Sequence, residues 1–182
     1  MAAKKALIPE LSAAKSLFLG NIVEENIFPY PELSSEDAET LSLVVDSLSR
    51  FLGPKSEMFR EFDKKGEQSL EFIQSLAELG LFGVIIPEQY GGVGLSNSAY
   101  ARVIEETSHY DGSTALTIGA HSSIGMKGIL LFGTDEQKQQ YLPRLATGEM
   151  IAAFCLTEPG SGSDAASIKT SAVKNPDGSW TL

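Results

Sequence analysis

The sequence lacks the features that mark several classes of protein. Cys155 is the only cysteine among the 182 residues, so no intramolecular disulfide can form and a disulfide-stapled fold is excluded. Basic residues are outnumbered, with 14 Lys and Arg against 24 Asp and Glu. The resulting net charge of −10 argues against a surface that binds nucleic acid or an anionic membrane. No uninterrupted apolar run approaches the roughly 20 residues that a membrane span needs.

The start of the sequence also lacks the marks of a targeting segment. The first nine residues read Met-Ala-Ala-Lys-Lys-Ala-Leu-Ile-Pro. Their apolar part is too short for a signal peptide, and they do not have the Arg- and Ser-rich amphipathic character of a mitochondrial presequence. We therefore expect a trimmed N-terminus.

What is present is typical of a globular protein that buries a sizeable core. Hydrophobic residues make up 42% of the chain and charged residues 21%. A chain of this length forms one domain, or one domain and part of another. Cys155 lies inside an apolar run, which predicts a reduced thiol in the core.

Helical patterns occupy the first 149 residues. Ser-Ser-Glu-Asp at 34–37 is a capping pattern, and the apolar residues between 41 and 52 fall on one helical stripe. Thr-Asp-Glu-Gln at 134–137 is a capping box that predicts another helix. The prolines within Phe-Pro-Tyr-Pro at 28–31 predict an extended stretch. Residues 81–94 mix apolar residues with Gly and Pro and predict a packed connector. The predicted helices cover residues 11–19, 34–52, 55–62, 70–79, 96–110, 112–132 and 134–147.

Residues 112–132 are apolar nearly all round, which predicts a helix in the middle of a bundle. Gly125 and Gly128 are three residues apart and share one face of this helix. Each mid-helix glycine costs about 1 kcal/mol relative to alanine, so something should compensate. Close packing of another helix would do so, and so would room for a bound ligand; the residues alone leave both open.

Two histidines are candidate functional residues. His109 lies near the end of the helix predicted over 96–110, where an imidazole stabilised by the helix dipole is favoured over a catalytic one. His121 lies on the apolar helix at 112–132. A pocket residue is one interpretation, and a hydrogen-bonded core histidine is the favoured one.

Strand and turn patterns begin at residue 150. Residues 150–156 are apolar and predict a strand that is buried on at least one face. Gly-Ser-Gly-Ser follows at 160–163; it predicts either a flexible polar turn or a loop whose backbone N–H groups curl around an anion. Residues 168–173 predict another strand, Asn-Pro-Asp-Gly at 175–178 a hairpin turn, and 180–182 the return strand.

The string Phe-Cys-Leu-Thr-Glu-Pro-Gly-Ser-Gly-Ser-Asp at 154–164 resembles the first signature of the acyl-CoA dehydrogenase family. The connector at 81–94 also resembles a segment of that family, Gly-Val-Pro-Glu-x-Tyr-Gly-Gly. Residues 119–133 and Phe-Pro-Tyr-Pro are most similar to the very-long-chain branch. The resemblance spans residues 17–182. It implies a mainly α fold with an N-terminal extension (1–33), an all-helical domain (34–149) and the first strands of a β-barrel-like middle domain (150–182).

The resemblance also implies a binding site for FAD and no metal. In the family the signature lies along the flavin ring, and its turn contacts FAD phosphates and CoA. Ser163 is implied in substrate binding as well, and Gly125 and Gly128 match glycines of the very-long-chain branch that line the acyl pocket. The implied flavin-binding residues are Phe154, Cys155, Leu156, Thr157, Glu158, Pro159, Gly160, Ser161, Gly162 and Ser163.

The implied reaction is the FAD-dependent oxidation of long- or very-long-chain acyl-CoA to trans-2-enoyl-CoA in fatty acid β-oxidation. The family's general base is a Glu beyond position 182, so no catalytic residue is assigned and the chain alone is expected to be inactive. Glu158 is expected to hold the turn. Implied partners are an electron-transferring flavoprotein and a second copy of the chain, in the mitochondrion. A scaffold of the complex I assembly type and a peroxisomal acyl-CoA oxidase are the alternatives.

Overall fold

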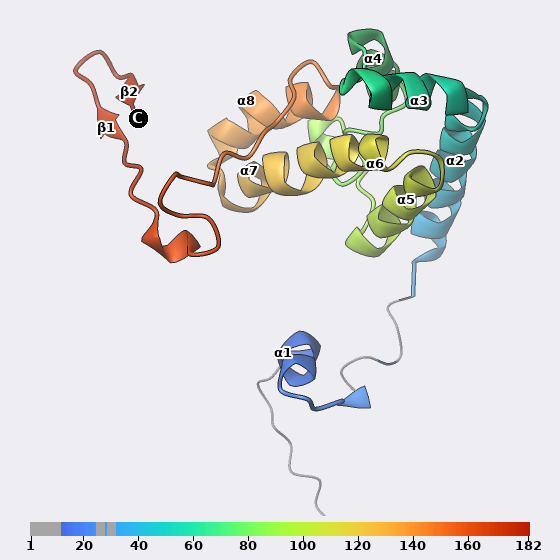
Figure 1. The fold of residues 1–182 in the computed structure, drawn as a ribbon, viewed down its shortest axis with the longest axis horizontal. Helices are drawn as coiled ribbons and strands as arrows, with labels where there is room; N and C mark the ends of the chain where they lie inside the picture. The colour runs from blue at the N-terminus through green and yellow to red at the C-terminus, as the bar shows by residue number, and fades with distance from the viewer. Residues whose placement is uncertain (1–11, 25–27, 29–31) are drawn as a thin grey trace, which may run out of the picture.

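Helices dominate the described part of the chain, as the sequence predicts. The computed structural model describes residues 12–24, 28 and 32–182. A short helix, α1 (Ala13–Phe18), lies apart from the helical body (Figure 1). The extended stretch predicted at 28–31 and the first eleven residues fall largely outside the described residues. The body contains α2 (Ser35–Leu52), α3 (Ser56–Lys65), α4 (Leu70–Glu78), α5 (Asn97–Tyr110), α6 (Gly112–Gly119), α7 (Lys127–Phe132) and α8 (Asp135–Ala146).

The helix starts follow the capping residues read from the sequence. Ser34 Oγ accepts a hydrogen bond from the Asp37 backbone N–H at 3.0 Å. At α8 the capping box is complete, because the Thr134 side chain accepts from the Gln137 N–H at 3.3 Å while the Gln137 side chain accepts from the Thr134 N–H at 2.9 Å. These local signals confirm the predicted starts. The end predicted for α3 was three residues early, since the helix continues to Lys65.

The connector at 81–94 joins two clusters of buried side chains. Phe82 and Val84 belong to a cluster formed with α2, α3, α4 and α5, whereas Ile86 and Tyr90 pack with α8 and Met126. The connector folds back on itself through hydrogen bonds such as Leu95 N–H to the Val84 carbonyl at 2.9 Å. This confirms the predicted packed connector and gives it a role in holding the two clusters together.

One continuous helix, Gly112–Phe132, crosses the body, but it is not buried all round. It consists of α6, a π-helical segment at Ala120–Met126 and α7. Ile118, His121 and Met126 face inward, whereas apolar side chains on the opposite side are exposed: Leu116, Ile124, Leu131 and Phe132. The prediction of burial all round is therefore wrong for the described chain, which covers only one face of the helix.

The length of this helix, 21 residues, and its mean hydropathy of 1.3 would also suit a membrane span. Burial of the polar Thr114, His121 and Ser122 against other helices of the body is, however, the pattern of a packed helix. Its segments pack on α5 and α8, as Figure 1 shows. We therefore interpret it as a helix of the body with one uncovered face.

Only two short strands form after α8. The strand β1 (Val173–Lys174) pairs antiparallel with β2 (Trp180–Thr181) and stands away from the helical body (Figure 1). The predicted turn between them is confirmed by the Gly178 N–H, which donates to the Asn175 carbonyl at 3.1 Å. The strand predicted over 150–156 does not form, and of the strand predicted over 168–173 only Val173 lies in a strand. A strand needs a neighbour to satisfy its backbone, and the described chain offers none to the other residues.

Candidate functional site

The candidate site is the stretch that leaves the end of α8, and a glycine sets its direction. Gly148 has a φ of +72°, which L-residues with a side chain rarely adopt. A Cβ at this position would lie 2.5 Å from the Ala77 Cβ and 2.9 Å from the Phe82 ring. The Met150 N–H then donates to the Arg144 carbonyl at 3.1 Å. Both the backbone conformation and the tight packing require glycine at this exit.

Residues 154–163, called the signature segment below, contain a closed turn. The Glu158 N–H donates to the Ser161 carbonyl at 2.9 Å, and the Ser161 N–H donates to the Glu158 carbonyl at 3.1 Å. Ser161 is 4% exposed, and its hydroxyl donates to the Asp164 carbonyl. The turn is therefore held from within and is more ordered than a flexible Gly/Ser linker.

Glu158 ties this turn to the chain that returns after it. Its carboxylate accepts hydrogen bonds from the Lys169 N–H at 3.0 Å, from the Thr170 N–H at 2.7 Å and from the Thr170 hydroxyl. These bonds, led by the one from the hydroxyl, lower the pKa of Glu158 because they favour the charged form. The prediction that Glu158 holds the turn is confirmed, and the carboxylate is thereby engaged in structure.

The turn and the two residues after it carry backbone donors. Within the described residues, the N–H groups of Gly160, Gly162 and Ser163 donate to no other group. Neither glycine has a positive φ, and a Cβ at Gly160 would meet nothing within 4 Å. At Gly162 the nearest atom to such a Cβ is the Thr157 methyl carbon at 3.9 Å. The chain itself therefore does not demand glycine here, whereas close approach of an anionic group to these donors would.

The apolar part of the signature segment faces outward. Phe154 is 57% exposed, Leu156 is 39% exposed and Cys155 is exposed. The predictions of a buried strand and of a core thiol at Cys155 are therefore wrong for the described chain. An apolar surface beside a set of free backbone donors is the combination expected where a ligand has both an aromatic and an anionic part.

The two glycines expected at an acyl pocket differ in their surroundings. A Cβ on Gly125 would lie 2.6 Å from the Ala152 Cβ, so this glycine permits close packing of the chain that leads into the signature segment. A Cβ on Gly128 would meet nothing within 4 Å. Close packing, one of the two compensations considered from the sequence, is thus present at Gly125, and open space is present at Gly128.

His121 is a hydrogen-bonded core histidine, as favoured from the sequence. It is 1% exposed, its Nε2 lies 3.0 Å from the Leu145 carbonyl oxygen and its Nδ1 lies 3.0 Å from the Ala152 N. Burial lowers the pKa of His121, although the bond to Leu145 acts in the opposite direction. Sequence patterns did not reveal the contact with Ala152, which is 31 positions away.

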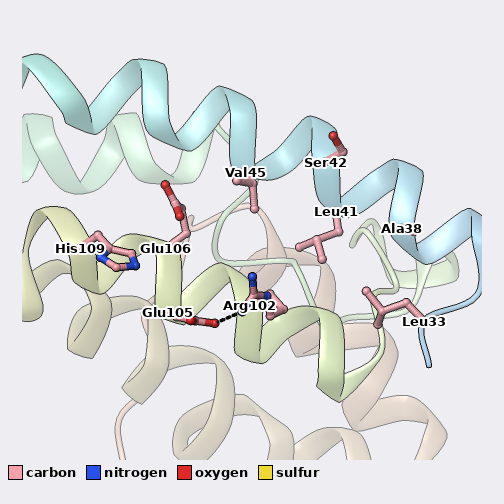
Figure 2. Close-up of a pocket in the computed structure, with 9 residues that line it drawn as sticks. All are labelled: Leu33, Ala38, Leu41, Ser42, Val45, Arg102, Glu105, Glu106 and His109. Atoms are coloured by element: carbon pink, nitrogen blue, oxygen red, sulfur yellow. Dashed lines mark hydrogen bonds and ion pairs between the residues drawn. The ribbon is translucent and has the colours of Figure 1, made fainter. Parts of the chain in front are cut away.

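A groove with a volume of about 290 Å³ lies between α2 and α5, away from the signature segment (Figure 2). Arg102 and Glu105 form an ion pair on its α5 side, and the Glu106 carboxylate accepts from the Ser49 hydroxyl at 2.9 Å. His109 lies on the last turn of α5, as predicted, and its side chain is exposed at one end of the groove. None of the residues of the signature segment lines this groove.

The comparisons with known proteins agree on one family. Residues 38–149 match the acyl-CoA dehydrogenase N-terminal domain. The chain is 48% identical to the mitochondrial very long-chain specific acyl-CoA dehydrogenase of Macaca fascicularis, over 98% of this chain and 27% of that protein. The chain therefore spans about a quarter of the length of this relative.

Solved structures are similar as well. A crystal structure of an acyl-CoA dehydrogenase from Bacillus anthracis in complex with FAD matches with a TM-score of 0.68 and 41% identity, over 90% of this chain and 27% of that one. A chain in a structure described as the electron transferring flavoprotein of Acidaminococcus fermentans matches with a TM-score of 0.70 and 36% identity, over 80% of this chain and 38% of that one.

Proposed function

The chain belongs to the acyl-CoA dehydrogenase family, and on that premise we propose that it contributes the helical domain and the first flavin-contacting segment to an FAD-dependent enzyme. This enzyme oxidises long- or very-long-chain acyl-CoA to trans-2-enoyl-CoA in fatty acid β-oxidation. The observation that carries the proposal is the turn at 158–164, with free backbone donors and two unobstructed glycines next to an exposed apolar segment.

The cofactor is FAD, which the FAD complex of the Bacillus anthracis relative supports. When bound, FAD supplies the ring that accepts a hydride. In this assignment Phe154 and Leu156 cover the apolar ring, and the N–H groups of Gly160, Gly162 and Ser163 hold an anionic group. Glu158 keeps the turn in shape through its bonds to residues 169 and 170. The full set of proposed flavin-binding residues is 154–163.

The proposal also assigns contacts with the acyl-CoA substrate. Ser163 is proposed to contact the acyl-CoA, and Gly128, with open space around it, to border the path of the acyl tail. Gly125 contributes indirectly, because its missing side chain lets Ala152 approach the helix. The preference for long chains is supported by the similarity to very-long-chain enzymes. We assign no general base within residues 32–182.

Partners and location follow from the relatives. An electron-transferring flavoprotein is the proposed electron acceptor, in line with the match to the Acidaminococcus fermentans structure. The proposed location is the mitochondrion, as in the names of the mammalian relatives. The proposed assembly is a homodimer, on the family resemblance alone.

The function is tested by flavin content and turnover of the full-length protein. We expect bound FAD and oxidation of palmitoyl-CoA, faster than of octanoyl-CoA, with an electron-transferring flavoprotein as acceptor. Gly162→Val should weaken FAD binding by at least about tenfold, since a side chain would keep the anion from charge-assisted backbone hydrogen bonds. Gly112→Val is the matched control, because Gly112 also has open space and no positive φ but lies outside the turn.

The possible failures point to different alternatives. A protein that binds no FAD and leaves palmitoyl-CoA unchanged would overturn the proposal and favour a scaffold. Release of hydrogen peroxide in place of reduction of the flavoprotein would identify an oxidase. Equal FAD binding by the parent and Gly162→Val would remove the turn from the cofactor site.

A further inference from the structure

The position of the signature segment depends on few attachments to the helical body. Between residues 151 and 157, one hydrogen bond of the described chain reaches the body, from the Ala152 N–H to His121 Nδ1 at 3.0 Å. Residues 153–157 are exposed. Ala152 is thus the last residue that the body holds before the segment begins, and the group that holds it is a side chain.

His121 is itself fixed on its other sides. Its ring lies 4.7 Å from the Phe82 ring, measured between centroids, at an interplanar angle of 60°. Its Nε2 contacts the Leu145 carbonyl, which also accepts from the Gly148 N–H at 3.1 Å. One helical turn after His121, Gly125 provides the space into which Ala152 fits. The imidazole therefore joins the π-helical segment, the end of α8 and the exit of the chain.

The two hydrogen bonds determine the protonation of the imidazole. A backbone N–H can only donate, so His121 Nδ1, which faces Ala152, carries no proton. A carbonyl oxygen can only accept, so Nε2 carries the proton and donates it to Leu145. The ring is a neutral imidazole that uses both nitrogens, and a cationic ring would direct a second N–H against the Ala152 N–H.

We propose that His121 is a positioning residue that sets the register of the signature segment on the helical body through its acceptor nitrogen. The proposal rests on the proposed function for its consequence, which is the placement of the flavin-contacting segment. The contact itself, His121 to Ala152, is independent of any cofactor.

The two bonds of His121 can be separated by substitution. In His121→Asn the side-chain oxygen can take the place of Nδ1, so the acceptor for Ala152 is kept while the donor to Leu145 is lost. In His121→Gln the longer side chain brings an amide N–H to the place of Nε2, so the donor is kept and the acceptor is lost. His121→Ala removes both. Val103→Ala, at a fully buried site on α5, is the control for general loss of stability.

The first readout is hydrogen exchange of the Ala152 amide at constant pH. We expect exchange to accelerate by about fivefold or more in His121→Ala and His121→Gln, since one net hydrogen bond is lost, and to stay near the parental rate in His121→Asn. Acceleration in Val103→Ala as large as in His121→Ala would show general loosening and overturn the proposal. An unchanged rate in His121→Ala would do the same.

The second readout is the dissociation constant for FAD in the full-length protein, followed by flavin fluorescence. FAD should bind several-fold more weakly to His121→Gln and His121→Ala and near normally to His121→Asn, so that the conservative acceptor rescues binding. Equal binding by all variants would overturn the positioning role. A parent that binds no FAD would instead contradict the proposed function, and the exchange measurement would still decide whether His121 holds Ala152.

Discussion

The helical body and the C-terminal stretch after α8 differ in whether their apolar side chains are buried. In the body, side chains such as Leu48, Leu76 and Val103 are completely buried. In residues 147–182, all of which are described, Ser161 alone is buried, while Ile151, Phe154 and Trp180 are more than half exposed. The body closes its own core, whereas the stretch after it is shaped by local hydrogen bonds and presents apolar surface, as binding surfaces do.

The largest expected difference between the two regions comes from the same substitution made in each. Leu76→Ala should lower the free energy of unfolding by about 2–5 kcal/mol, because it leaves a cavity in a fully buried site. Leu156→Ala, at a side chain that is 39% exposed, should cost less than about 1 kcal/mol. Urea unfolding followed by circular dichroism measures both. Equal losses would mean that the signature segment is part of the core.

A smaller effect is expected where the two regions join. Gly148→Ala should lower the free energy of unfolding by about 2 kcal/mol, since it adds backbone strain to a collision with Ala77 and Phe82. Gly66→Ala is the matched control: its φ of +71° carries the same strain, but nothing lies within 4 Å of its Cβ position, so about 1 kcal/mol is expected. A loss at Gly148 no larger than at Gly66 would show that the exit is loosely packed.

The smallest effect is a dependence of the free energy of unfolding on pH that originates at His121. Its pKa in the folded protein is below the ordinary value of 6.5, because burial disfavours the cation. His121 therefore binds a proton more readily in the unfolded chain than in the folded protein. The free energy of unfolding is at its full value, as far as this group is concerned, above pH 6.5, and it decreases as the pH falls below 6.5. The free energy of unfolding should change with pH by at most about 1.4 kcal/mol per pH unit.

This pH dependence can be assigned by substitution. At the end of α8, Arg144 pairs at 2.7 Å with Glu149, which follows the helix. Lys127, on the same helix as His121, donates to the Asn97 side chain at 2.7 Å. The carboxyl groups whose pKa is lowered have ordinary values of 4.5 or less, so they titrate below this window. His121→Gln should therefore abolish the slope between pH 5 and 6.5. Persistence of the slope in His121→Gln would assign it to another group.

Much of this protein is determined by residues close together in the sequence. The caps at Ser34 and Thr134 bond to residues three positions on, and the hairpin turn closes between Asn175 and Gly178. Such contacts depend on residue types at short fixed spacings, so patterns predict them. The capping signals and the periodicity of the helices were sufficient to predict where most helices of the body lie, and the string at 154–164 was sufficient to indicate the family.

Tertiary structure alone decided the rest. The bonds of His121 to Leu145 and Ala152 span 24 and 31 positions, and no spacing rule connects those residues. The same holds for the connector that joins two clusters of the core and for the exposure of Cys155 and of one face of Gly112–Phe132. Apolar character states that a residue can be buried; whether it is buried depends on which surfaces the folded chain brings against it.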